Sequence, residues 1–182
     1  METSEAAARR ARFEDLVAAT YVPLQRYLRR RTDLTSADDV LGEVLLVMWR
    51  RFDDMPGDAA LPWCYAVARG CLANDVRGGR RRRLLHDRLR RERPPAPPDA
   101  TTTDHLEHAM ARLPATHREV LHLWAWEQLA PREIAVVLDI SANAASIRLH
   151  RATSRLRELV TEGKDRPPGG HLTPRQGTEA PR

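Results

Sequence analysis

The sequence predicts an all-α protein built from two small helical domains that are joined by a Pro-rich linker. Apolar residues recur at intervals of three and four positions in several segments, which is the pattern of helices that bury one face. Residues 93–103 contain four prolines and three threonines, a composition that favours extended chain over a packed core. A chain of 182 residues with 42% hydrophobic and 5% aromatic content can bury one ordinary core or two small ones.

Three helices are expected before the linker. The first is marked by one apolar stripe, which consists of Phe13, Leu16, Val17, Tyr21, Leu24 and Leu28. The second covers residues 37–52, with Ser36 as its expected N-cap because an acidic residue follows three positions later. An acidic loop over residues 53–60 separates it from a third helix, which Pro62 is suited to start. The glycines at positions 78 and 79 are expected to weaken or end this helix, although the arginines beyond them could resume it.

Four helices are expected after the linker. Apolar spacing predicts two of them near residues 106–113 and 116–124, the second with Thr116 as its N-cap. A short helix that Pro131 starts, a turn over residues 139–141 and a long helix capped by Ser141 then form a helix-turn-helix. At about 100° per residue, the buried seam of the long helix runs through one set of side chains. These are Ala145, Leu149, Ala152, Leu156 and Leu159.

The opposite face of the long helix carries short or polar side chains, with one apolar group and one cation among them. Its residues are Asn143, Ser146, Ile147, His150, Arg151 and Ser154. Such a face suits the major groove, because Asn can read adenine, Arg can read guanine or bind phosphate, and Ile147 can touch a thymine methyl. The alternative is an ordinary exposed helix face, and a helix-turn-helix alone names no function.

A cationic segment lies between the third helix and the linker. Nine arginines stand against Asp87 and Glu92 over residues 77–93, a local charge of +7 in a chain whose formal charge is +5. A merely solvated surface would mix the two signs, so this concentration indicates nucleic acid or another polyanion as partner. The alternative is a GC-rich genome that writes Arg for Lys throughout, and Lys164 is indeed the only lysine of the sequence.

Three runs of sequence resemble the extracytoplasmic-function group, or group 4, of the sigma-70 family of RNA polymerase sigma factors. The most specific run, LPATHREVLHLWAWEQLAPREIAVVLDISANAASIRLHRATSRLREL, covers residues 113–159 and resembles the second conserved domain of the family. The runs ADDVLGEVLLVMWRRFDDM and LPWCYAVARGCLANDVRGGRRR, at 37–55 and 61–82, resemble the first. The resemblance implies a protein that binds core RNA polymerase and promoter DNA and directs promoter-specific transcription initiation.

The resemblance also implies a division of the chain. Residues 9–92 would form sigma region 2, a helical bundle that binds polymerase and recognises and melts the minus-ten element. Residues 93–103 would be the linker, and residues 104–161 would form sigma region 4, the helix-turn-helix that meets the minus-thirty-five element. Residues 162–182, rich in Pro and Gly, are expected to be a disordered tail.

Residue roles follow from the same resemblance. Polymerase contacts are expected from Asp39, Glu43, Val47 and Trp49. DNA contacts are expected from Asn74, Arg77, Arg80, Arg81 and Arg82 in the first domain, and from Asn143, Ser146, Ile147, His150 and Arg151 in the second. The acidic loop over residues 53–60 would capture a flipped promoter base.

The sequence departs from the family pattern at several of these places. Gly42 stands where Gln is common in the polymerase-binding helix, and Gly70 stands where Asn is frequent near the melted strand. Ser146 and Ile147 replace the Arg and Ser often found in the recognition helix. A promoter sequence therefore does not carry over from the family to this chain.

Two other functions compete with this interpretation. A stand-alone helix-turn-helix regulator that binds an operator as a dimer would need a ligand pocket or a dimerising heptad, and the N-terminal sequence offers no obvious one. A nucleic-acid enzyme would need clustered carboxylates or metal ligands. The candidate pairs are Asp38 with Asp39, Asp53 with Asp54, and His105 with His108, which are better explained as a cap, a solvated loop and an exposed helix face. We therefore expect no catalysis, no metal and no cofactor.

The sequence also bears on the compartment. No apolar run approaches the roughly 18 residues of a spanning helix, and the N-terminal stretch lacks the apolar core of a signal peptide. Cys64 and Cys71 lie seven positions apart on one predicted helix face, where we expect them to be buried small hydrophobes. We expect a cytoplasmic protein without membrane association. A dedicated anti-sigma protein is a further candidate partner.

Overall fold

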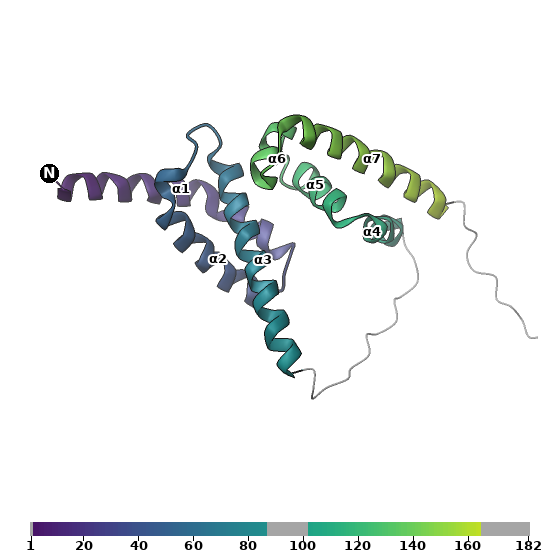
Figure 1. Ribbon diagram of the computed structural model, residues 1–182, viewed down its shortest axis with the longest axis horizontal. Coiled ribbons are helices and arrows are strands. Elements are labelled where there is room, and N and C mark those ends of the chain that lie inside the picture. The colour runs from purple at the N-terminus through teal and green to yellow at the C-terminus, as the bar shows by residue number, and fades with distance from the viewer. Residues whose placement is uncertain (1, 87–101, 165–182) are drawn as a thin grey trace, which may run out of the picture.

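The computed structural model describes residues 2–86 and 102–164, with side chains for residues 4–77 and 106–163 (Figure 1). Within these residues the chain is all-helical and contains no strand, as the sequence predicts. The elements are α1 (Glu2–Arg29), α2 (Leu34–Arg50), the 3-10 helix η1 (Phe52–Asp54), α3 (Ala60–His86), α4 (Thr102–Arg112), α5 (Ala115–Ala125), α6 (Pro131–Leu138) and α7 (Ala142–Lys164). We call α1–α3 the N-terminal half and α4–α7 the C-terminal half.

In the N-terminal half, α1, α2 and α3 pack on one another. The predicted N-cap at Ser36 is wrong, because α2 begins three residues earlier than predicted, at Leu34, with Asp33 as its cap. The Asp33 carboxylate accepts the backbone N–H of Ser36 at 3.0 Å and the Ser36 hydroxyl at 2.8 Å. An aspartate in extended conformation thus satisfies the first turn, and the serine lies within the helix.

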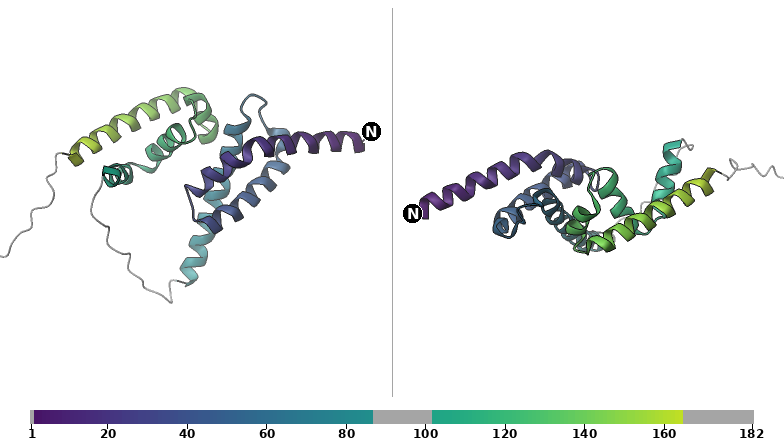
Figure 2. Two further views of the ribbon diagram at one scale, coloured as in Figure 1. Left: turned by 180° about the vertical axis from the view of Figure 1, so that it is seen from behind. Right: turned by 90° about the horizontal axis from the view of Figure 1, so that it is seen from above.

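Two helices are longer than the sequence predicts. The helix α1 begins at Glu2, and its first part projects beyond α2 and α3 (Figure 2). The helix α3 continues through Gly78 and Gly79 to His86, so these glycines do not end it. Each glycine costs a helix only about 1 kcal/mol relative to Ala, and the arginines around them are good helix formers.

The C-terminal half contains the predicted helix-turn-helix, made by α6 and α7. Ser141 caps α7 as expected, because its hydroxyl accepts the N–H of Ala144 at 3.1 Å. Asp139 forms the turn with a positive φ of 52°, a conformation that Asp tolerates better than most residues. The predicted cap at Thr116 is wrong, since α5 begins at Ala115 after Pro114.

The ends of the C-terminal half also shift from the predicted boundaries. Residues 102 and 103, predicted as linker, form the start of α4, and residues 162–164, predicted as tail, continue α7. The rest of the predicted linker and tail, residues 93–101 and 165–182, lies outside the described residues.

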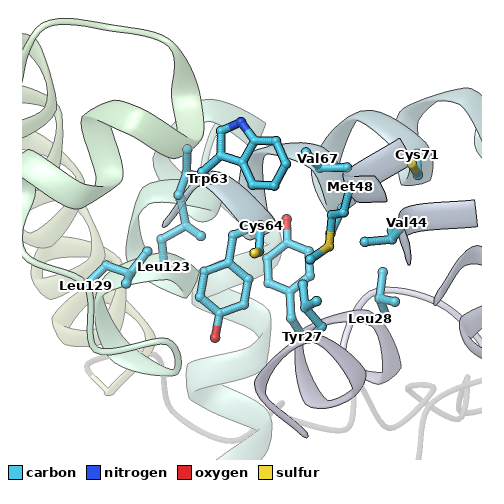
Figure 3. Close-up of a cluster of buried hydrophobic side chains, with 14 of the residues drawn as sticks. Tyr27, Leu28, Val44, Met48, Trp63, Cys64, Val67, Cys71, Leu123 and Leu129 are labelled. Atoms are coloured by element: carbon cyan, nitrogen blue, oxygen red, sulfur yellow. The ribbon is translucent and has the colours of Figure 1, made fainter. Parts of the chain in front are cut away.

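The two halves share a hydrophobic core, in which α3 packs against α6. Figure 3 shows Trp63 and Cys64 of α3 next to Leu123 and Leu129 of the C-terminal half. Trp63 is only 7% exposed, so its ring packs in the core and is not available on the surface to stack on a nucleic-acid base. Cys64 and Cys71 are buried as expected, and burial raises the pKa of each thiol to about 11.

A buried cluster of ion pairs also joins the halves. The side chain of Glu127, which follows α5, is 2% exposed and lies between two arginines that follow α1. Arg31 Nη1 donates to Glu127 Oε1 at 3.1 Å, and Arg30 Nη2 donates to the other carboxylate oxygen. The Arg31 guanidinium also lies 3.7 Å from the centre of the Tyr27 ring. The N-terminal half therefore supplies the positive charges and the C-terminal half the negative charge that balances them.

Replacing Glu127 with Ala should destabilise the protein, because Arg30 would lose its carboxylate and Arg31 would keep only the more distant Glu119, at 3.7 Å. Removing one partner of a buried pair costs about 3–5 kcal/mol. We expect a loss of that order in the free energy of unfolding, measured by urea denaturation. The control is Glu158→Ala, whose pair with Arg155 is exposed on both sides and contributes about 0–1 kcal/mol. Equal losses in the two variants would contradict the assigned role of Glu127.

The stability should also depend on pH through His122. Burial lowers its pKa to about 4, and the nearby charges of Arg31, Arg118 and Arg30 add to this effect. An unfolded His has a pKa of about 6.5, so between these values the unfolded chain binds a proton that the folded chain rejects. Stability should therefore fall as pH drops below about 6.5. Urea midpoints at pH 7 and pH 5 should differ less in His122→Gln than in the unsubstituted protein, and an equal difference would contradict the assignment.

Candidate nucleic-acid interface

The recognition helix α7 presents the predicted outward residues on its exposed face. Asn143, Ser146, His150 and Arg151 are exposed, and Ile147 is 44% exposed, whereas Ser154 is half-buried. The predicted seam is turned inward, with Ala145, Ala152 and Leu159 buried and Leu149 and Leu156 packed against the core. The 100° projection therefore assigns both faces of this helix correctly except at Ser154, which lies at the edge of the exposed face.

Ser146 differs from its neighbours on this face. Its hydroxyl donates to the carbonyl oxygen of Ala142 at 3.0 Å, one turn earlier in α7. The proton is then engaged within the helix, and the oxygen can still accept a hydrogen bond from a base. Asn143, His150 and Arg151 carry the donors of the face that bond to no other residue among those described with side chains.

The N-terminal half offers a second cationic region on α3. Asn74 and Arg77 are exposed one turn apart, and an Arg77 Nη2 donor bonds to the Asn74 Oδ1 acceptor at 2.5 Å. The structure thus brings these two predicted residues together. Arg80, Arg81 and Arg82 continue the same helix, but their side chains lie outside the described ones. Arg69 on α3 and Arg148 on α7 also face this region and were missed, because neither belongs to a run or to the outward face.

The helix α2 places the four predicted polymerase-binding residues unevenly. Asp39 and Glu43 are exposed, whereas Val47 and Trp49 are half-buried. At 100° per residue, the last two fall on opposite flanks of the exposed face, about 80° to either side of Asp39. Leu46, at 48% exposure, lies near the middle of this face, about 20° from Asp39 on the side away from Glu43, and was missed.

Trp49 is held beneath α1. Its ring contacts Phe13 edge-to-face, with centroids 5.0 Å apart, and the Arg9 guanidinium lies 4.3 Å from its centroid. Because Trp49 is half-buried, one part of its side chain packs against α1 and the rest is exposed. Its predicted contact with polymerase stays a prediction.

Arg9 connects α1 to the start of the acidic loop. Its Nη2 donates to the Trp49 carbonyl oxygen at 2.9 Å, and its Nε lies 3.2 and 3.3 Å from the two Asp53 carboxylate oxygens. Sequence reasoning missed this residue because the contact spans 44 positions and no local pattern marks it. One guanidinium thus fixes both the C-terminus of α2 and the first residue of the loop.

Comparison with known proteins agrees with this architecture. The family described as Sigma-70, region 4, matches residues 104–156, which cover most of the C-terminal half. The ECF RNA polymerase sigma factor SigL of Mycobacterium tuberculosis is 32% identical over 172 residues, covering 87% of this chain and 92% of that protein. The RNA polymerase sigma factor CarQ of Myxococcus xanthus is 32% identical over 160 residues, covering 82% of this chain and 90% of that protein.

A helix-turn-helix joined to a second helical bundle, with relatives that match both halves, defines an RNA polymerase sigma factor. More narrowly, the chain belongs to the ECF family of sigma factors.

Solved structures support the fold. The sigma factor RpoE of Bartonella quintana, in complex with the anti-sigma factor NepR, aligns with a TM-score of 0.60 at 20% identity over 85% of this chain and 98% of that one. The structure of CnrH in complex with the cytosolic domain of CnrY aligns with a TM-score of 0.57 at 24% identity over 88% of this chain and 94% of that one. In the described part of the chain, no helix is long and apolar enough to cross a membrane.

Replacing Arg9 with Ala should loosen the beginning of the acidic loop. The amides of Asp54 and Met55 bond to the carbonyls of Arg51 and Phe52 in η1, which Arg9 holds in place through Asp53. Hydrogen exchange at these two amides should accelerate in the variant, because η1 could then open locally without first breaking the contacts of Arg9. The matched control is Arg10→Ala, which removes only an exposed pair with Glu14. Unchanged exchange in Arg9→Ala would contradict the proposed support.

Proposed function

We propose that this protein binds core RNA polymerase through α2 and directs it to promoters that α3 and α7 contact. The observation that carries the proposal is the exposed face of α7, where Asn143, His150 and Arg151 present free polar groups on a helix-turn-helix. In this division of labour, α7 reads the minus-thirty-five element, and the N-terminal half recognises and melts the minus-ten element. The alternative of a dimeric operator-binding regulator is not supported, because the relatives that match both halves are sigma factors.

The DNA surface would combine reading and neutralisation. Asn143, Ile147 and Arg151 can meet adenine, a thymine methyl and guanine, respectively. Asn74, Arg77 and the arginines at 80–82 would bind backbone phosphate without reading sequence, which makes binding dependent on salt. Specificity would then come from α7 and from the loop after α2.

The polymerase surface would be the exposed face of α2. Asp39 and Glu43 supply its charge, and Leu46 with Val47 supplies apolar area beside them. Such a mixed patch is typical of a protein interface with an apolar centre and a polar rim. Gly42 also lies on this face. No heavy atom lies within 4 Å of a Cβ built there, so the space above this residue is open to a partner.

Three further properties belong to the proposal. The protein would act without catalysis of its own, since its relatives are sigma factors, and it would act in the cytoplasm, where polymerase and promoter DNA meet. An anti-sigma protein is proposed as a third partner, because the RpoE structure with the same fold is a complex with the anti-sigma factor NepR.

The proposal is tested by mixing the purified chain with core RNA polymerase. We expect co-elution in size-exclusion chromatography and transcripts that depend on both the protein and a selected promoter. Binding of the free chain to duplex operators without polymerase, together with no co-elution, would favour the dimeric regulator.

Replacing Arg151 with Ala should reduce promoter-dependent transcription and leave polymerase binding unchanged. Arg151 is exposed on α7, far along the chain from the proposed polymerase surface on α2. Losing a base-reading arginine costs about 1–3 kcal/mol, which corresponds to roughly 5- to 150-fold in affinity. The control is Arg157→Ala, also exposed and later in α7. Full transcription by Arg151→Ala across a range of salt would show that this side chain does not face DNA.

A charge reversal at Glu43 should weaken polymerase binding without unfolding the protein. Val44, the next residue, is fully buried, so a substitution there would report on folding rather than on the interface. Glu43→Lys changes only an exposed side chain, and we expect a loss of roughly tenfold in affinity, as placing a like charge in an interface costs at least about 1.4 kcal/mol. Glu107→Lys on α4 is the matched control. Equal affinities of the two variants for polymerase would show that α2 is not part of the interface.

A further inference from the structure

A cleft of about 560 Å³ opens between the two halves, and arginines from both halves converge on it. Arg69 and Arg77 come from α3, Arg148 comes from α7, and Arg31 comes from the segment between α1 and α2. We call this space the interdomain cleft. Its size falls within the roughly 300–1,000 Å³ of small-molecule sites.

The charges around the interdomain cleft do not balance. Glu119 is the one carboxylate among its described lining residues, and it lies 3.7 Å from Arg31, which also pairs with Glu127. Arg69 and Arg148 form no hydrogen bond and no ion pair with any residue that the structure describes in side-chain detail. Guanidinium groups remain charged at any ordinary pH, so this excess of positive charge cannot be relieved by losing protons. An anion would relieve it.

The start of α5 adds neutral donors to the same wall. Ala115 and Thr116, the first residues of this eleven-residue helix, line the cleft. Pro114 occupies the N-cap, where no side chain caps the first turn. The first N–H groups of a helix point outward along its axis and carry the positive end of its dipole, which favours anions, phosphate among them.

We propose that the interdomain cleft binds the phosphate groups of an anionic ligand, held by Arg69, Arg77 and Arg148 and by the N-terminus of α5. Guanidinium forks bind phosphate bidentately, and several of them around one cleft suit a ligand with several linked phosphates better than a single chloride. Two sources share this chemistry, a small polyphosphate and the backbone of a nucleic acid. The binding itself does not depend on the proposed function, because it rests only on the lining of the cleft.

Such a ligand would favour the closed arrangement of the two halves. The arginines of α3 and the arginine of α7 surround one ligand only while α3 and the C-terminal half are packed together, so separation of the halves would break the site. A ligand that binds one state better stabilises that state by its difference in affinity. On the proposed function, in which each half meets its own promoter element, the bound anion would oppose the working arrangement.

The test uses the full-length chain and inorganic tripolyphosphate at constant ionic strength, with binding measured by titration calorimetry. We expect saturable binding at one site per chain. The double variant Arg69→Ala with Arg148→Ala should bind at least roughly tenfold more weakly, because each charge-assisted hydrogen bond is worth about tenfold or more. The matched control is Arg132→Ala with Arg157→Ala, which removes two exposed arginines outside the cleft lining and changes the net charge equally.

The outcomes separate the site from general attraction of anions to a basic protein. Retention of affinity in the control and loss in the cleft variant would support the site. No saturable binding, or equal loss in both variants, would overturn it. A short duplex DNA is then added to the tripolyphosphate complex: displacement identifies nucleic-acid backbone as the ligand, and persistence identifies a small polyphosphate. Because polymerase is absent from every arm, failure of the site leaves the proposed function standing, and the co-elution assay judges that function separately.

Discussion

The relative placement of the two halves depends on one buried carboxylate, that of Glu127. It lies between Arg30 and Arg31, and Arg31 in turn stacks on Tyr27 within the N-terminal bundle. The pair brings α5 and its following turn against the end of α1, and with them α6 against α3. The shared core and the interdomain cleft both follow from that contact. The relative orientation of the two halves of this sigma factor is thus set by charge.

The ion pairs and the apolar contacts contribute different things to this arrangement. Removing two charges from water costs much of the free energy that their attraction supplies, so a buried ion pair is a weak source of net stability. It acts mainly by destabilising arrangements in which one charge is buried without its partner. The apolar contacts of Trp63 with the C-terminal half lack direction but supply favourable free energy when they leave water. The charges therefore set how the two halves are oriented, and the apolar core keeps them together. A partner protein that offers both kinds of contact to one half can take the place of the other half.

Periodic features could be predicted from the sequence, and long-range polar contacts could not. The faces of α7 and its Ser141 cap follow from spacing within about one turn, which a local pattern records. The bond between Arg9 and Asp53, by contrast, joins residues that nothing in the sequence pairs. The predicted N-caps were wrong for a different reason. Asp33 and Pro114 occupy the N-cap positions of α2 and α5 in place of Ser36 and Thr116, because these helices start earlier than the apolar periodicity does. The polymerase contacts predicted on α2 remain predictions, and the spacing that marks Trp49 as one of them does not record its packing against Phe13.

The position of Arg77 connects the two proposed activities of the molecule. It is exposed beside Asn74 on the surface proposed for promoter DNA, and it also lines the interdomain cleft. A guanidinium that holds an anion in the cleft cannot at the same time bind a phosphate of the melted promoter. If the anion is a small polyphosphate, its binding in the cleft and promoter binding would thus compete for the same cation. The competition needs no movement of α3 itself, because the same Arg77 side chain lines the cleft and lies on the surface proposed for DNA.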